Sequence, residues 1–176
     1  MVGAMGAALC AMVARITLQS PRHATVHAAA EAIVAEADAL RARFEAARPI
    51  DEQAYALVVA AGTLPKRTDE EKRARAAAMQ AALVGAAEAP LAAAGLAAEG
   101  CASAERTGAL GNAHLVSDVE CALHFFRAAL AASTANVRIN HRFIKDPSVV
   151  RAQDERLIAI LTAAKATLDR AFAALT

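Results

Sequence analysis

The feature that most limits the fold of this chain is its alanine content, since roughly three in every ten of its 176 residues are alanine. Alanine has the highest helix propensity of all residues, and its side chain fills little space in a core. No stretch alternates apolar and polar residues as a half-buried strand does, whereas apolar residues recur at three- and four-residue intervals. The sequence therefore predicts an all-α protein whose helices pack closely.

The chain length predicts one domain, residues 1–176. A chain of this size buries a real core but is short for two domains. Small side chains leave each helix little apolar area to bury within one copy. We therefore expect a single-domain bundle of about six to seven helices that oligomerises through helix packing.

Proline residues place the first helix boundaries. Helices are expected over residues 2–18, 22–47 and 51–61, with Pro49 ending the second of them. The chain then enters its clearest loop, residues 62–67, where a Gly and a Pro lie close together.

Capping residues place the later helices. Thr68 and Glu71 have the spacing of a capping box, which begins a helix that is expected to bend or end at Pro90. A further helix is expected over 91–104. Another is predicted over 117–140, and it is central because it is apolar on much of its circumference.

The last helix is predicted to begin at the pair Asp146 and Pro147, an N-cap followed by proline at the first helical position, and to run to about residue 174.

Charge and cysteine content exclude several classes of function. The net charge is +1 with no basic stripe and few aromatic residues, which argues against a nucleic-acid partner. The three cysteines show no CxxC spacing, so neither a disulfide framework nor a zinc site is predicted. The apolar run over residues 1–13 is too short to span a membrane. We expect a cytoplasmic protein with no membrane association.

Polar residues near the predicted loops are the candidates for chemistry. Lys66 lies in the 62–67 loop, and Asn112, Ser117 and Asp118 lie at the entry to the most apolar helix. Solvated charge is the plain interpretation of Lys66, and an N-cap is that of Ser117 or Asp118. The alternative is a site where a helix N-terminus, an amide and a carboxylate converge.

The five histidines give weak signals. His23 and His27 have the i, i+4 spacing that can hold a metal, but no third ligand follows nearby. His114 has no ligand spacing at all. We therefore predict no metal site and interpret His23 and His27 as exposed helix residues.

Several short motifs, in their order and spacing, resemble one known family over nearly the whole chain. They are Met12-Val13-Ala14-Arg15-Ile16-Thr17, Asp51-x-x-Ala54-Tyr55, Leu64-Pro65-Lys66, Glu71-Lys72-x-x-Arg75 with Gln80, Pro90, Gly111-Asn112 with Ser117-Asp118, and Asn136-Val137-Arg138-Ile139-Asn140 with Asp146. The family contains the cyclodeaminase domain of formiminotransferase-cyclodeaminase and the methenyl-tetrahydrofolate cyclohydrolases of the serine cycle.

The resemblance implies an all-helical homo-oligomer, most simply a dimer, that binds a folate in a cleft lined by helix ends. It implies hydrolysis of methenyl- to formyl-tetrahydrofolate, or cyclisation of formimino-tetrahydrofolate with loss of ammonia. Tetrahydrofolate is the substrate, and no further cofactor is implied. The catalytic residues implied by the matching motifs are Asp118, as proton acceptor, with Lys66 and Asp51. The implied substrate-binding residues are Asn112, which orients the reacting group, with Ser117, Tyr55, Asn136 and Asn140.

Two departures from the family pattern leave other functions open. The Gly-rich loop that precedes the segment at Val2–Gly6 in family members lies outside this sequence, and Gln19-Ser20-Pro21-Arg22 stands where Gly-Lys-Lys is usual. His114 stands where Asn is common. A relative acting on a non-folate small molecule, and a catalytically silent helical oligomer, are the two alternatives.

Overall fold

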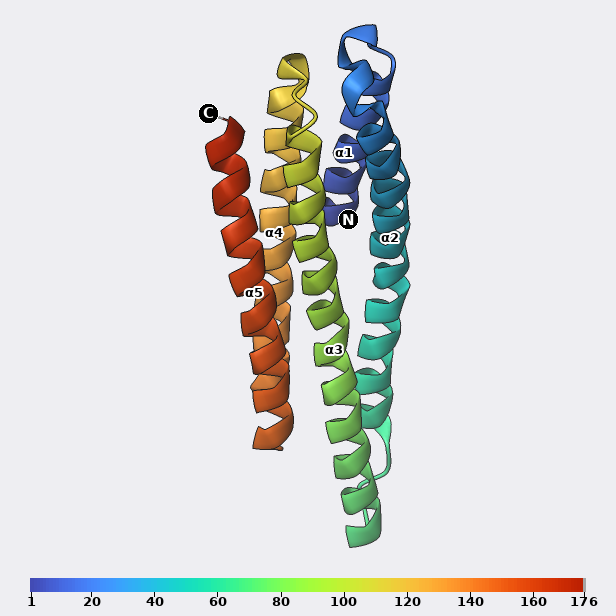
Figure 1. Ribbon diagram of the computed structural model, residues 1–176. Helices are drawn as coiled ribbons and strands as arrows, with labels where there is room; N and C mark the ends of the chain where they lie inside the picture. Colours follow the sequence, from blue (N-terminus) through green and yellow to red (C-terminus); the bar gives the residue numbers. More distant parts are fainter. Residues whose placement is uncertain (176) are drawn as a thin grey trace.

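The structure is a computed structural model that describes residues 1–175, and it consists of long helices joined by short connections (Figure 1). Two of the connections contain a 3-10 helix. The elements in chain order are α1 (Val2–Leu18), η1 (Pro21–Val26), α2 (His27–Thr63), α3 (Asp69–Gly108), η2 (Ala113–Leu115), α4 (Val116–His141) and α5 (Pro147–Leu175). The all-α prediction is confirmed for these residues.

The helices form an elongated bundle in which chain direction alternates (Figure 1). Helices α1, α3 and α5 run one way and α2 and α4 run the other, so consecutive loops lie at opposite ends. Helix α3 is central, because it packs against each of the other four long helices. Its length and apolar composition would also suit a membrane span, but its place at the centre of the bundle explains both.

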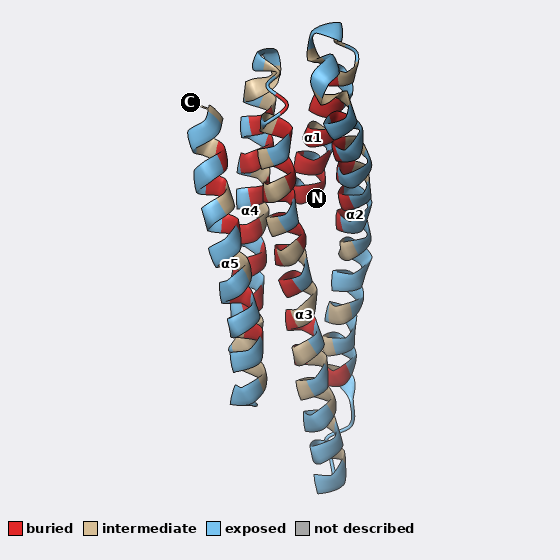
Figure 2. Ribbon diagram, in the orientation of Figure 1, coloured by how far each residue is buried: buried red, intermediate tan, exposed pale blue. Residues whose placement is uncertain are grey.

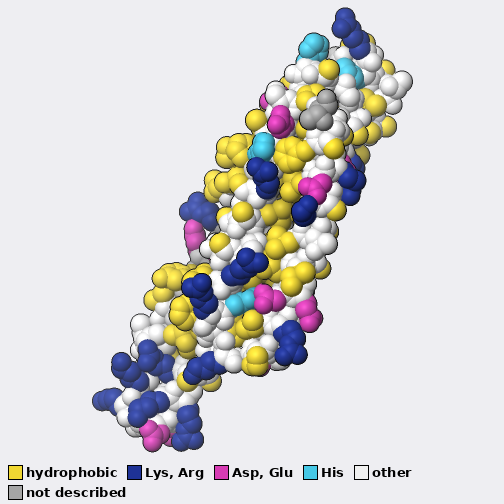
Figure 3. Space-filling view, turned by 90° about the vertical axis from the view of Figure 1, so that its left-hand side faces the viewer, with side chains coloured by type: hydrophobic (Ala, Val, Ile, Leu, Met, Phe, Trp, Pro, Cys, Tyr) yellow, Lys and Arg dark blue, Asp and Glu magenta, His cyan; other side chains and the backbone are white. Residues whose placement is uncertain are grey.

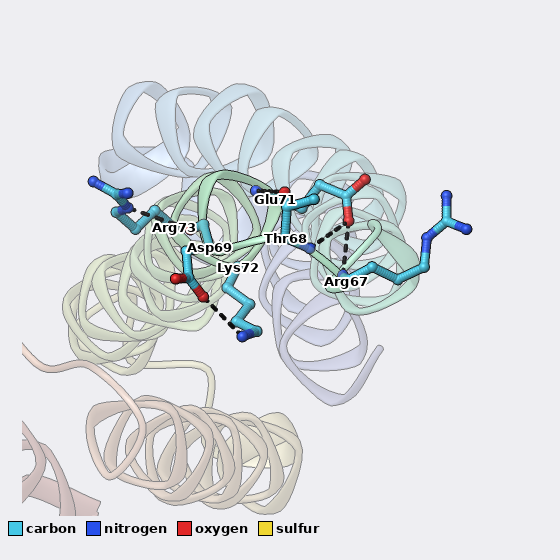
Figure 4. A network of polar contacts seen from close by, with 6 residues as sticks. All are labelled: Arg67, Thr68, Asp69, Glu71, Lys72 and Arg73. Carbon is cyan, nitrogen blue, oxygen red and sulfur yellow. Dashed lines mark hydrogen bonds and ion pairs between the residues drawn. The ribbon is translucent and has the colours of Figure 1, made fainter.

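Two of the predicted helix starts are confirmed by their caps. The Thr68 hydroxyl accepts from the Glu71 backbone N–H at 3.1 Å, and the Glu71 carboxylate accepts from the Thr68 N–H at 3.1 Å (Figure 4). The Asp146 carboxylate accepts hydrogen bonds from the hydroxyl and the backbone N–H of Ser148, and these bonds lower the pKa of Asp146. Both caps satisfy N–H groups that a helix start leaves without partners.

The helix ends expected at Pro49 and, as one of two alternatives, at Pro90 were wrong, so residues 1–175 contain five long helices instead of six to seven. Helix α2 continues through Pro49, which is exposed, so water can reach the carbonyl that this proline frees.

Helix α3 continues through Pro90, which is buried, so the carbonyl that loses its helix partner there needs another donor. That carbonyl belongs to Ala86, four residues earlier, and the side-chain amide of Asn140 on α4 donates to it at 2.9 Å.

The core is thin and held together by close approach of helix backbones (Figure 2). Its largest fully buried side chain, Phe126 of α4, lies against Gly6 of α1 and Gly100 of α3. A Cβ atom added at Gly100 would lie 2.2 Å from the Phe126 ring, and one at Gly6 would lie 2.8 Å from it. The two glycines therefore make room for an aromatic ring in a core that is otherwise largely alanine.

The hairpin formed by the end of α2 and the start of α3 projects beyond the turn between α4 and α5 (Figures 1 and 2). Most of its residues are exposed, including the large apolar side chains of Tyr55, Leu57, Val59 and Leu64. We call residues 55–75 the hairpin tip. Only two helices meet there, so the tip has no core comparable to that of the rest of the bundle.

Candidate functional site

The predicted site residues lie in three separate places along the bundle. Asn112, Ser117 and Asp118 lie at the end formed by η1 and η2, whereas Lys66 lies at the hairpin tip. Asp51 and Asn136 line a groove between these two ends. Helix α3 joins the two ends with 40 residues, about 60 Å of helix. Lys66 and Asp118 of one copy therefore cannot act on the same atom.

The cavity at the first end has a volume of about 320 Å³. We call it the Asn112 cavity; it is lined by Ile16, Ser20, Arg22, His23, Gly111, Asn112, Ala113, His114 and Leu115. The backbone turns into it at Gly111, whose φ of 72° lies in the left-handed region that favours glycine. Histidine side chains gather at this end of the molecule (Figure 3).

Hydrogen bonds to α1 fix the orientation of the Asn112 amide. Its Nδ2 donates to the buried Thr17 hydroxyl at 3.1 Å, and that hydroxyl donates to the Val13 carbonyl at 2.8 Å. The amide oxygen of Asn112 keeps no hydrogen bond to any residue in the described part of the chain. An oriented amide oxygen beside a cavity is available to accept a hydrogen bond from a ligand.

Ser117 and Asp118 belong to the first turn of α4, which follows the cavity-lining residue Leu115 in the chain, but neither is among the residues that line the cavity. Neither caps the helix, because the N-cap position is Leu115 and no side chain bonds there. Asp118 is half-buried in that turn, and an anion there is favoured by the positive end of the helix dipole. The capping interpretation of these residues is therefore wrong, and the Asp118 carboxylate keeps no bond to a described residue.

The groove in the middle of the bundle has a volume of about 300 Å³ and is formed by α2, α3 and α4. Asp51 and Asn136 line it with Arg48, Glu52 and Ser133. Tyr55 lies one helical turn beyond Asp51 and is 68% exposed. Asn140 follows Asn136 by one turn, but its amide is committed to the carbonyls of Ala86 and Asn136 at 2.9 and 3.0 Å. Its visible role is structural.

Cations surround a third cavity, of about 360 Å³, at the hairpin tip (Figure 3). Lys66, Lys72 and Arg75 line it over the apolar side chain of Met79. Lys72 pairs with Asp69 at 2.9 Å (Figure 4), and Arg75 Nη2 donates to the Gly62 carbonyl at 2.8 Å. Arg75 Nε is buried and has no partner among the described residues. This cavity suits a carboxylate group, which can accept from such donors.

Sequence reasoning missed two residues, His23 and His114. Both line the Asn112 cavity, although His23 was predicted to be an exposed helix residue and His114 was noted only as a departure from the family pattern. The proline at position 21 was the available signal, because it begins the 3-10 helix η1, which contains His23 and precedes α2. Among residues 1–175 no three His, Cys, Asp or Glu side chains lie close enough together to hold a metal ion.

The fold and cavities define a class of all-helical proteins with small-ligand cavities at and between their helix ends. More specifically, the chain belongs to the formiminotransferase-cyclodeaminase family, whose family model matches residues 1–158. The family prediction made from the motifs is confirmed.

Individual relatives extend this match over nearly the whole chain. The methenyltetrahydrofolate cyclohydrolase of Methylorubrum extorquens is 33% identical over 170 residues, covering 97% of this chain and 82% of that protein. The formimidoyltransferase-cyclodeaminase of Sus scrofa is 29% identical over 162 residues, 92% of this chain, but the match spans only 30% of that longer protein. The crystal structure of formiminotetrahydrofolate cyclodeaminase from Thermotoga maritima has a TM-score of 0.86 at 26% identity, covering 99% of this chain and 83% of that one.

Proposed function

We propose that the chain is a folate one-carbon enzyme that acts on the carbon between two folate nitrogens. It hydrolyses methenyl-tetrahydrofolate to formyl-tetrahydrofolate, or cyclises formimino-tetrahydrofolate with loss of ammonia. The observation that carries the proposal is the 33% identity to a methenyltetrahydrofolate cyclohydrolase over 97% of the chain. Hydrolysis is the first choice, because the cyclodeaminase relatives are less similar in sequence.

The end with the Asn112 cavity supplies the groups that hydrolysis needs. Water adds to the cationic methenyl carbon and loses a proton, and the Asp118 carboxylate is the proposed acceptor. Asp118 then passes this proton to the nitrogen that leaves the carbon, and the C–N bond breaks as the hydroxyl proton is released to solvent and the formyl C=O forms, so one proton is released overall. The oriented amide of Asn112 holds the reacting group, and Ser117 lies beside Asp118 in the same helical turn.

Lys66 is proposed to reach this site from a second copy of the chain. Two bundles lying side by side in opposite directions bring the hairpin tip of one copy to the Asn112 end of the other. Lys66 then stabilises charge or holds the glutamate of the folate, and Asp51 and Asn136 line the groove between the ends. Tyr55 is exposed on α2 one turn beyond Asp51, where it can contact a ligand that extends from the groove. The homo-oligomer is therefore proposed to be a dimer at least.

Exposed apolar side chains support this pairing. On α1, Val2, Met5, Leu9, Met12 and Ile16 follow one another at three- and four-residue intervals and are exposed or half-buried. This spacing is that of a helix face which packs against another helix. On the hairpin tip, four large apolar side chains are exposed as well. A partner that runs in the opposite direction places its hairpin tip against the apolar face of α1. The two-fold symmetry of the dimer makes the same contact a second time.

We further propose that the enzyme works in the cytoplasm and requires no cofactor beyond its tetrahydrofolate substrate, with neither membrane nor nucleic acid as a partner. All three cysteines are free, as expected in a reducing compartment. The reaction itself exchanges water and protons and no electrons.

The test is hydrolysis of methenyl-tetrahydrofolate by the purified protein, followed by loss of its near-ultraviolet absorbance against a buffer blank. Turnover should disappear in Asp118→Asn and fall strongly in Lys66→Ala, with circular dichroism unchanged. Absence of turnover in the folded wild-type protein, for both this reaction and the release of ammonia from formimino-tetrahydrofolate, would refute the folate proposal.

Mixing the two variants tests the shared site. Subunit exchange between Lys66→Ala and Asp118→Asn makes half of the dimers mixed, and one of the two sites in each mixed dimer is then intact. The mixture should regain about one quarter of the wild-type activity. A mixture that exchanges subunits but stays inactive shows that Lys66 and Asp118 do not act in one site across the dimer.

A further inference from the structure

His23 differs from the other side chains of the Asn112 cavity because it carries a buried polar atom without a partner. Its Nδ1 atom is buried and has no hydrogen-bond partner among residues 1–175. A buried polar atom left unpaired is destabilising, so such atoms are rare in native proteins and call for an explanation.

The side chain of His23 is not needed to hold its own turn. The Ser20 carbonyl accepts both the His23 backbone N–H at 3.0 Å and the His27 Nε2–H at 3.2 Å, and Pro21 fixes the first helical position. The donors to Ser20 are thus a backbone group and a different histidine. Structure alone therefore does not explain an imidazole at position 23.

The backbone presents His23 to the cavity. Its φ of −106° and ψ of 18° are non-helical and make a kink inside η1. This conformation belongs to the bridge region, where residues of active sites are often found. Because no described group bonds to Nδ1, nothing fixes which edge of the ring faces inwards.

The chemistry of the cavity selects a flat heterocycle. Its lining combines apolar side chains, Ile16 and Leu115, with the imidazoles of His23 and His114, which can donate and accept, and the free oxygen of Asn112, which accepts. The Arg22 guanidinium adds donors at the same cavity. Its volume of about 320 Å³ is at the lower end for ligand cavities, which suits one ring system and not an extended ligand. The cation-lined cavity at the hairpin tip is better suited to carboxylates.

We propose that the Asn112 cavity binds the pterin-type ring of the substrate and that His23 is a substrate-contacting residue there, hydrogen-bonded to the ring's amide-like edge. The proposal rests on the proposed folate function and assigns the two parts of that substrate to different cavities. The ring lies at the histidine end of one copy, and the glutamate tail lies at the hairpin tip of the other. His23 directly follows Gln19-Ser20-Pro21-Arg22, one of the segments in which this sequence departs from the family pattern.

Affinity measurements with the intact substrate and with its two halves test the assignment. Calorimetry is performed with methenyl-tetrahydrofolate, with a tetrahydropterin that lacks the tail, and with p-aminobenzoylglutamate. His23→Ala should weaken binding of the tetrahydropterin and of the intact substrate about three- to tenfold, the effect of one lost hydrogen bond. Binding of p-aminobenzoylglutamate should not change. His124→Ala is the matched control, because His124 packs on Phe172 away from the cavity.

Two further variants separate hydrogen bonding from folding. Asn and Gln at position 23 place an amide near the ring positions Nδ1 and Nε2, so His23→Asn or His23→Gln should restore part of the lost affinity. In the wild-type protein, adding the tetrahydropterin should shift the imidazole nitrogen resonances of His23 and leave those of His124 in place.

The outcomes distinguish the two proposals. The role of His23 is overturned if folded His23→Ala binds both ring-containing ligands with unchanged affinity. It is also overturned if the His23 imidazole resonances do not shift when the tetrahydropterin is added. The folate function then stands. If the wild-type protein binds none of the three ligands, the folate function itself fails.

Discussion

Replacing Asn140 by alanine removes the donor that compensates for Pro90. Pro90 has no N–H to give to the Ala86 carbonyl, and the Asn140 amide of α4 supplies that hydrogen bond at 2.9 Å. After Asn140→Ala the carbonyl lies in a buried part of α3 with no donor. A buried acceptor left unpaired costs about 1–3 kcal/mol, which is the expected loss in the free energy of unfolding.

The cause of this loss can be isolated with a second substitution. In Pro90→Ala the backbone N–H of residue 90 is restored and can bond the Ala86 carbonyl itself. Asn140→Ala should then cost much less, so the two substitutions should show a coupling energy of about 0.5–3 kcal/mol. Asn136→Ala is the control, since the Asn136 side chain is exposed one turn away and should change stability by less than about 0.5 kcal/mol.

Urea unfolding followed by circular dichroism gives the four free energies of the cycle, at one fixed protomer concentration because an oligomer unfolds in a concentration-dependent way. The reasoning is refuted if Asn140→Ala costs the same with and without Pro90. In that case Asn140 stabilises the bundle through its bond to Asn136 or through packing, and the continuity of α3 has another cause.

Three further predictions concern stability. Gly100→Ala forces its new methyl group against the buried Phe126 ring, whereas Gly85→Ala meets nothing within 4 Å; the first should unfold about 4–8 °C below the second in thermal melts, since overpacking costs about 2 kcal/mol. Equal melting temperatures would contradict the tight contact. Thr68→Ala should lower the free energy of unfolding by about 1 kcal/mol through loss of the cap, unless the hairpin tip already opens before the bundle unfolds. Burial raises the pKa of the Cys10 thiol from its usual 9.0 to about 12, so only the unfolded chain loses this proton between those values. The contribution of Cys10 to the free energy of unfolding is therefore fully present below pH 9. The free energy of unfolding should fall as the pH rises from 9 towards 12, and it should fall less in Cys10→Ala.

The fold class and several helix ends could be predicted because they depend on local chemistry. The Thr68–Glu71 capping box and the Asp146–Pro147 start involve residues close in sequence, and the structure has both. The helix ends expected at Pro49 and Pro90 were wrong because the local penalty of each proline is offset, at exposed Pro49 by water and at buried Pro90 by a tertiary contact. In the case of Pro90 the compensating group is 50 residues away on another helix.

The same error obscured where the candidate site residues lie. Because α2 and α3 are unbroken, the loops that carry Lys66 and Asn112 must lie at opposite ends of the bundle. If the helices ended at Pro49 and Pro90, the relative positions of these two loops would not be determined. The pairing of Asp51 with Asn136 in one groove, and the place of His23 beside Asn112, depend on how separate helices pack. No spacing within the sequence encodes either juxtaposition.

The exposed hairpin tip gives the molecule a gradient of local stability along its length. At the Asn112 end several elements meet, whereas at the tip two helices have only each other. Backbone amides near Lys66 should therefore exchange hydrogen through small local openings, and those around Phe126 only through global unfolding. A partner or ligand that orders the tip must supply the free energy of that ordering, and slower exchange at the tip would report its binding.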